Sequence, residues 1–177
     1  GKYPSTVTQF VAGGADESDL ELLTTTNWLM KNVRLTRAYF SAFHPIRDTP
    51  LENKAAVDPL REHRLYQASF LLRDYGFDLE DLPFTQNENL PLHTDPKMAW
   101  AQMNLKESPV EINKAERREL LRIPGIGPKH ADAILQARRT TKLRDLTALR
   151  KIGIVVARVS PFVLLDGRRA ESQLVLF

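Results

Sequence analysis

The stretch at residues 120–137 reads Leu-Leu-Arg-Ile-Pro-Gly-Ile-Gly-Pro-Lys-His-Ala-Asp-Ala-Ile-Leu-Gln-Ala, and it is the most specific pattern in this 177-residue chain. Apolar residues recur at helical spacing on both sides of residues 123–127, so the pattern predicts two helices joined by a tight turn. Gly125 and Gly127 can take backbone angles that a Cβ atom forbids, and they let another backbone approach closely. Pro128 suits the first turn of the second helix, where its missing N–H has no partner anyway.

The start of this second helix is expected to bind anions. The first turn of a helix leaves backbone N–H groups without intrahelical partners, and glycines in front of it let an anion come close. The chain carries 25 Lys and Arg residues against 22 Asp and Glu residues. In a basic protein the commonest large anion is nucleic acid, so the hairpin predicts contact with a phosphate backbone.

The same residues resemble the helix-hairpin-helix family of DNA-binding domains, including those of competence proteins. The core of that family reads apolar-x-x-Leu-Pro-Gly-Ile-Gly-x-x-x-Ala-x-x-Ile, and here Ile123 stands at the leucine position while the remainder is present. In that family, backbone amides of the hairpin grip DNA phosphates without reading sequence. The resemblance implies phosphate contact through Gly125, Ile126 and Gly127, with Pro124 in the turn and Arg122 and Lys129 beside the phosphate. The alternative is that the hairpin only forms a compact corner between two helices or holds a protein partner.

A second, weaker copy of the hairpin follows the first. A shift of 28 residues places residues 121–126 on residues 149–154, with Leu, Arg, Gly and Ile repeated in place. Such self-similarity predicts a duplicated unit whose apolar faces pack on each other. Ile152 replaces the proline and Val155 replaces the second glycine, and a β-branched residue there crowds a phosphate. We expect this copy to be structural first and a weaker DNA contact second, through Arg150, Lys151 and Gly153.

Positive charge is concentrated in the second part of the chain. Residues 110–177 carry a net charge of +7, whereas residues 1–109 carry −4. Such an asymmetry is typical of an anion-binding module attached to an acidic body. Nine basic residues fall in or beside the two hairpins, and together they predict an electrostatic footprint for a phosphate backbone. They are Arg122, Lys129, Arg138, Arg139, Lys142, Arg144, Arg150, Lys151 and Arg158. Few aromatic residues accompany them, so duplex DNA is a better expectation than single strands stacked on rings.

The composition narrows the class of protein. Hydrophobic residues make up 42% of the chain, which is ordinary for a globular protein. No apolar run approaches the roughly 20 residues that span a bilayer, and no secretory signal is apparent, so we expect a cytoplasmic protein without membrane contact. The absence of cysteine removes disulfides and thiolate chemistry. The four histidines show no metal-ligand spacing, so no metal site is expected.

The first part of the chain predicts one parallel βαβ unit. Residues 7–12 alternate as a strand, and a helix begins at Ser18, where Ser18 and Glu21 form a capping box. Residues 37–43 read as the next strand. The loop after the first strand lies where open α/β sheets and barrels place their ligands. A lone βαβ unit leaves sheet edges unpaired, so helices must cover them, or the chain must form a homo-oligomer or join the remainder of a barrel.

This part resembles the late strands of a radical S-adenosylmethionine barrel. The resemblance rests on the glycine loop at residues 13–18, the Tyr-Phe-Ser-Ala-Phe-His-Pro strand at residues 39–45 and the segment at residues 61–77. The nearest group consists of radical S-adenosylmethionine proteins described as DNA modification or repair enzymes, which end in a helix-hairpin-helix tail. The resemblance places Gly13, Gly14 and Glu17 near that cofactor. Radical chemistry needs three cysteines to hold a 4Fe–4S cluster, and this chain has none. We therefore expect no cofactor and no catalysis in this chain, with the cluster and S-adenosylmethionine only in a longer parent.

The sequence thus predicts an α/β region at residues 1–109, a partial barrel-like βαβ unit with helices. An all-α tandem helix-hairpin-helix domain is expected to follow at residues 110–177. The leading expectation for function is non-sequence-specific DNA binding in a repair, modification or uptake context. The alternatives are the substrate-docking end of a radical S-adenosylmethionine enzyme acting on nucleic acid, and a protein-interaction scaffold.

Overall fold

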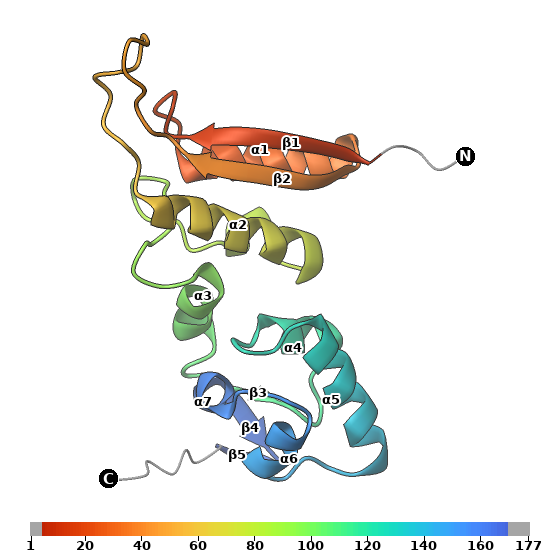
Figure 1. Cartoon of the computed structure of the whole chain (residues 1–177). Coiled ribbons are helices and arrows are strands. Elements are labelled where there is room, and N and C mark those ends of the chain that lie inside the picture. Colours follow the sequence, from red (N-terminus) through yellow and green to blue (C-terminus); the bar gives the residue numbers. More distant parts are fainter. Residues whose placement is uncertain (1–4, 170–177) are drawn as a thin grey trace. The chain divides into compact units, whose positions relative to one another are not determined.

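The computed structural model describes residues 5–169 and divides into two compact units (Figure 1). Within the described residues, the first unit comprises residues 5–73 together with Phe77–Pro96, and the second comprises Asp74–Gly76 and residues 97–169. The expected boundary after residue 109 lies later than this division. Helix α3 (Pro96–Asn104) accounts for the difference, because its buried residue Ala101, and Leu105 directly after it, belong to the core of the second unit.

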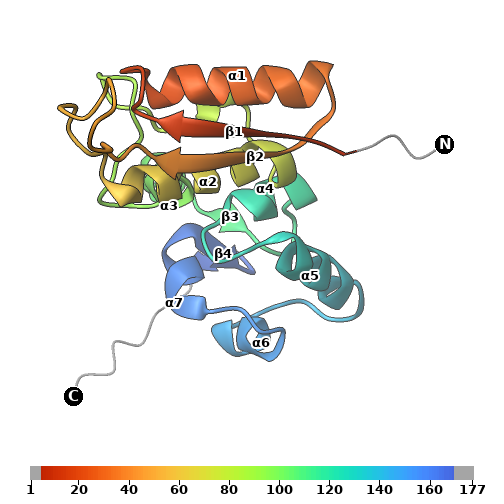
Figure 2. The same cartoon turned by 45° about the horizontal axis from the view of Figure 1, so that its top comes forward.

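The first unit contains the predicted βαβ arrangement. Strands β1 (Thr6–Ala12) and β2 (Leu35–Ala42) pair in parallel, and helix α1 (Asp19–Asn32) connects them. Figure 2 shows α1 lying along the two strands. The predicted capping box is present: the Glu21 amide donates to Ser18 Oγ at 3.2 Å, and the Ser18 amide donates to the Glu21 carboxylate at 2.7 Å. The helix start therefore follows directly from the local sequence.

Helix α2 (Pro59–Asp74) protects the outer edge of β2. The Phe40 amide donates to the Tyr66 hydroxyl at 3.1 Å, and the Ala42 amide donates to the Glu62 carboxylate at 2.9 Å. These contacts satisfy backbone groups that a sheet edge leaves open to pairing with another chain. The outer edge of β1 pairs with no further strand among residues 5–169. A short 3-10 turn, η1 (Leu79–Asp81), follows α2.

The second unit holds the two hairpins and a small sheet. Its helices after α3 are α4 (Arg117–Arg122), α5 (Pro128–Thr140), α6 (Leu146–Lys151) and α7 (Val156–Val159), and α7 runs into the 3-10 turn η2 (Ser160–Phe162). Strands β3 (Val110–Glu111), β4 (Val163–Leu165) and β5 (Arg168–Arg169) form a sheet in the order β3-β4-β5.

The expectation of an all-α domain is therefore wrong. Strands β4 and β5 form an antiparallel hairpin across Asp166 and Gly167, which both have positive φ, at 53° and 78°. An Asp-Gly pair favours this turn type because both central residues of a tight hairpin need left-handed angles. The signal was present in the sequence, but the strands that it joins are very short.

One buried apolar cluster unites the elements of the second unit. Its residues come from α3, Ile112 directly after β3, both hairpins, η2 and β4, which explains why the hairpins and the sheet fold together. Eight of its large members are fully buried: Ile112, Leu120, Ile123, Ile126, Ile134, Leu149, Val159 and Val163. Burial of side chains of this size contributes about 1.5–3 kcal/mol each, so this cluster is the main stabilising feature of the unit.

Glu111 ties β3 to the β4–β5 turn. Its carboxylate accepts hydrogen bonds from the amides of Asn113 at 2.9 Å, Gly167 at 2.7 Å and Asp166 at 3.3 Å. Burial by itself raises the pKa of Glu111, but these donors outweigh it and hold the pKa below its ordinary value. The ionised form is thus preferred in the folded state.

A Glu111→Gln variant tests this contact through its pH dependence. A carboxyl whose pKa is lower in the folded state stabilises the fold above its unfolded pKa, and that contribution disappears as the pH falls. We expect Glu111→Gln to melt at a lower temperature than the wild type at neutral pH. The difference in melting temperature between the variant and the wild type should narrow as the pH falls below about 4.5, the ordinary pKa of this carboxyl. A gap that is constant from neutral to acidic pH would contradict the assignment, and thermal melts at several pH values measure it.

Candidate nucleic-acid interface

The first hairpin consists of α4, the turn at residues 123–127 and α5. The Ile123 amide donates to the Leu120 carbonyl, and the Ile126 amide donates to the Ile123 carbonyl, both at 3.1 Å. Gly127 is the N-cap of α5, and Pro128 follows at its first position. The predicted helices and turn are therefore present, and α5 begins where the missing N–H of a proline has no cost.

The two turn glycines serve different purposes. Gly125 has a φ of 86°, and a Cβ there would lie 3.1 Å from Val159 Cγ2 and 3.2 Å from Arg158 Cβ. Gly125 therefore needs both the backbone freedom and the small size of glycine. Gly127 has a φ of −104°, which other residues also adopt, so the expectation of an unusual angle there is wrong. A Cβ at Gly127 would lie 3.3 Å from the Tyr75 hydroxyl.

Four backbone N–H groups at this turn are available to a ligand. The amides of Gly125, Gly127, Lys129 and His130 make no hydrogen bond with any residue between 5 and 169. The Ile126 amide, which the family resemblance included among the phosphate contacts, is instead donated within the turn. The amides of Lys129 and His130 were missed, although their places after Pro128 in the first turn of α5 are where helices leave donors open.

The side chains around these amides differ in whether they already have interaction partners within the protein. The Lys129 side chain is exposed and has no partner among the described residues, whereas Pro124 is buried. The Arg122 guanidinium lies 4.8 Å from the centre of the Trp100 ring, and it donates to the Gly76 carbonyl at 3.4 Å. Lys129 is thus the basic side chain of the first hairpin that is best placed to meet an anion.

The second hairpin repeats the geometry of the first. Gly153 has a φ of 86°, the same as Gly125, and Ile154 is buried as Ile126 is. Val155, which stands at the position of Gly127, is the N-cap of α7 and is 63% exposed. The valine therefore occupies the surface where the first hairpin offers its N-cap amide, which agrees with a weaker anion contact there.

Each hairpin turn packs against the helix that follows the other turn. Gly125 lies against Arg158 and Val159 at α7, while the position of a Cβ on Gly153 lies 3.7 Å from His130 Nε2 on α5. The two turns are thus side by side on one surface of the second unit. A ligand bound at one turn is close to the basic residues of the other.

The basic residues around the hairpins fall into two groups. Arg138 donates to the carbonyls of Ile112 and Ala115, and Lys142 forms an ion pair with Asp166 at 3.1 Å. These two side chains therefore make contacts that stabilise the fold. In contrast, four exposed basic side chains make no hydrogen bond or ion pair with the rest of the described chain: Lys129, Arg144, Arg150 and Lys151.

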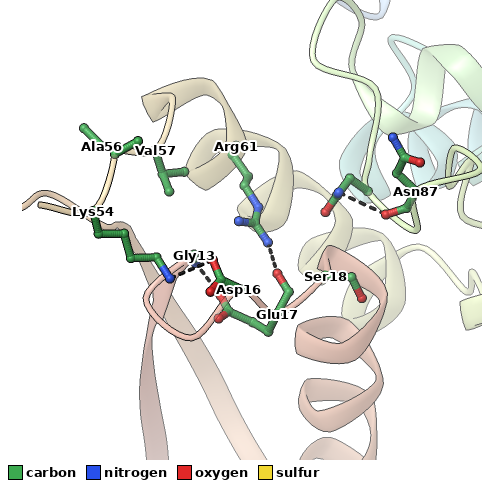
Figure 3. A pocket seen from close by; sticks show the side chains of 11 residues that line it. Gly13, Asp16, Glu17, Ser18, Lys54, Ala56, Val57, Arg61 and Asn87 are labelled. Carbon is green, nitrogen blue, oxygen red and sulfur yellow. Dashed lines mark hydrogen bonds and ion pairs between the residues drawn. The ribbon is translucent and has the colours of Figure 1, made fainter. Parts of the chain in front are cut away.

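The first unit contains a polar pocket at the end of β1. The pocket measures about 530 Å³ and is lined by Gly13, Glu17, Lys54, Arg61 and Asn87, among others (Figure 3). It includes two of the three residues that the barrel resemblance placed near a cofactor. Gly14 is the third, and it does not line the pocket.

The loop that follows β1 at this pocket is held together by the carboxylate of Glu17, which is part of the same loop. Glu17 accepts hydrogen bonds from the amides of Gly13 and Ala15, the latter at 3.0 Å. Burial raises the pKa of Glu17, but these amides and the nearby Arg61 outweigh it and hold the pKa below the ordinary value. A Cβ on Gly13 would overlap the Val57 side chain, so protein rather than a cofactor fills the space beside this glycine.

A buried ion pair fixes the wall of the same pocket. Arg61 Nε donates to the fully buried Asp19 carboxylate at 2.7 Å, and the Leu90 amide donates to its second oxygen at 2.8 Å. Arg61 also donates to the Glu17 carbonyl at 2.6 Å. The charges that line this pocket are therefore largely paired with each other, as Figure 3 shows for Lys54 and Asp16.

Two features are not found among residues 5–169. No three side chains of His, Cys, Asp or Glu gather closely enough to hold a metal ion. No helix in this described part of the chain has the length and apolar character needed to cross a membrane.

The two turn glycines provide a matched pair of stability variants. We expect Gly125→Ala to reduce the free energy of unfolding by about 1–3 kcal/mol, because a left-handed alanine is strained and its methyl group meets α7. Gly127→Ala should cost far less, since its backbone angles suit any residue. Urea unfolding of both variants measures the difference, and equal losses would show that the turn geometry is misassigned.

Comparison with known proteins identifies the hairpin region. Residues 105–158 match the family model described as the helix-hairpin-helix motif. The chain is also 41% identical over 66 residues to the kinesin-like protein KIN-10B of Arabidopsis thaliana. That match covers 34% of this chain and 10% of the relative, so the chain spans about a tenth of the curated relative that it matches. No solved structure matches the chain. The second unit thus carries a helix-hairpin-helix motif, as the sequence predicted.

Proposed function

We propose that this chain binds the phosphate backbone of duplex DNA through its first hairpin, without sequence specificity. The observation that carries the proposal is the set of unpaired amides at Gly125, Gly127, Lys129 and His130 within a helix-hairpin-helix motif. Backbone N–H groups at a helix N-terminus favour anions through hydrogen bonds and through the helix dipole. They recognise phosphate and carry no information about base sequence.

The surrounding charge supports the same ligand. Lys129 stands beside the amides, and Arg150 and Lys151 of the second hairpin are exposed without partners among the described residues. Each phosphate neutralised by such a side chain releases counterions, so binding should weaken as salt rises. We expect affinities in the micromolar range or weaker from one complete hairpin, as for non-specific binding in general.

Duplex DNA is favoured over single strands because residues 110–169, which hold both hairpins, present no exposed aromatic ring on which bases could stack. In residues 110–177 the aromatic residues are Phe162 and Phe177. Phe162 is buried in the core, and Phe177 lies outside the described residues. Binding to single strands relies on aromatic side chains that stack on exposed bases. The biological context that we propose is DNA repair, modification or uptake.

A second candidate function is the nucleic-acid docking part of a radical S-adenosylmethionine enzyme. The specific observation in its favour is the pocket at the end of β1 in a parallel βαβ unit, where α/β folds place their ligands. Because the chain contains no cysteine, the cluster and the catalysis would have to come from residues outside it. Phosphate binding by the hairpin is common to both candidates.

Fluorescence anisotropy with a labelled duplex of about 20 base pairs tests the proposal across a salt series. Lys129→Gln should weaken binding and lower the slope of log affinity against log salt by about one unit, the value of one phosphate contact. Lys31→Gln, which removes an exposed lysine from α1 of the first unit, is the matched control and should change neither. If the wild type binds no duplex at low salt, the proposal fails and the hairpins are a protein-interaction scaffold.

A further inference from the structure

We propose that Tyr75, which lies outside the matched motif, completes the phosphate site of the first hairpin by donating its hydroxyl to the phosphate held by the Gly127 amide. The inference rests on the proposed function and adds a side chain to that site. Tyr75 belongs to the short segment Asp74–Gly76 that packs with the second unit. The motif match begins only at residue 105, so the motif does not include this tyrosine.

The Tyr75 hydroxyl lies at the start of α5. It lies 3.3 Å from the place where a Cβ of Gly127 would stand, directly beside the N-cap of α5. The body of the tyrosine ring packs against the apolar core of the second unit. The ring is therefore anchored in the protein, and its polar end is presented at the residue whose amide is open to an anion.

Lys97 holds this arrangement in place and adds positive charge. Its ammonium lies 4.6 Å from the centre of the Tyr75 ring, and it donates to the carbonyl of Ile126, next to Gly127. A cation over an aromatic ring is attracted by the negative face of the ring. The lysine thus connects the tyrosine to the hairpin turn, and its charge lies close to the proposed phosphate position.

The hydroxyl is free to donate. The Tyr75 hydroxyl makes no hydrogen bond with any residue in the described part of the chain. Burial and the nearby Asp74 carboxylate raise the pKa of Tyr75, so the hydroxyl keeps its proton at neutral pH. A neutral hydroxyl beside open amides can donate to an anion, and a phosphate carries enough oxygens to accept from both.

The same geometry explains why residue 127 is glycine. The φ of −104° at this position does not require glycine. A methyl group there would instead lie 3.3 Å from the Tyr75 hydroxyl and press on it. Glycine therefore preserves the room in which the hydroxyl and a phosphate oxygen can meet.

Tyr75→Phe tests the inference because it removes only the hydroxyl and keeps the ring under Lys97. We expect duplex affinity to fall about tenfold, the low end for a hydrogen bond to a charged group. The salt slope should stay unchanged, since no charge is removed. Tyr39→Phe, at an exposed tyrosine of the first unit, is the matched control and should bind as the wild type does.

The outcomes separate the two proposals. If the wild type binds no duplex, the proposed function itself fails. If the wild type binds and Tyr75→Phe binds equally well, the hairpin function stands and the role of Tyr75 is overturned. Should Tyr75→Phe lower the melting temperature, Gly127→Ala supplies the second test. It should weaken binding in the wild type and add little to the loss in Tyr75→Phe, and full additivity of the two losses would also overturn the inference.

Discussion

The second unit depends on the left-handed backbone at Gly125 and Gly153. Each glycine turns the chain between two helices, and each lets its turn lie against the helix that follows the other turn. A side chain at Gly125 would meet α7 at 3.1 Å, so the contact between the hairpins exists only because the Cβ is missing. The buried isoleucines that follow the glycines, Ile126 and Ile154, then fill the core between the repeats. Backbone conformation, more than side-chain chemistry, sets the architecture of this region.

The same constraint produces the open amides. Because the turn is so tight, the Ile126 amide donates within it to the Ile123 carbonyl, while the amides of Gly125 and Gly127 on either side have no acceptor between residues 5 and 169. Pro128 starts α5 immediately, which leaves the amides of Lys129 and His130 in the first helical turn without carbonyls to accept them. The unpaired donors are thus a direct consequence of how the hairpin folds. In the second hairpin the same turn ends in an exposed valine, so similar backbone geometry offers a poorer site.

Much of this could be read from the sequence, for identifiable reasons. Local sequence patterns predicted the hairpin at residues 120–137, its repeat and the βαβ unit, and the structure contains all three. The sequence could not show why residue 127 is a glycine. The reason is the neighbouring hydroxyl of Tyr75, and Tyr75 is distant from Gly127 in the sequence. The engagement of Arg122 with Trp100 was hidden for the same reason. The β4–β5 hairpin was missed although Asp166-Gly167 signalled it, since such short strands have no periodicity to detect.

The central claim is that specific backbone amides of the first hairpin hold a phosphate, and amide-resolved nuclear magnetic resonance tests it most directly. Titration of the ¹⁵N-labelled chain with a short duplex reports on each N–H group separately. The account predicts the largest shifts at Gly125, Gly127, Lys129 and His130, with a smaller shift at Ile126, whose amide is already bonded. Shifts that avoid these residues and gather elsewhere, for example around the pocket of the first unit, would contradict it.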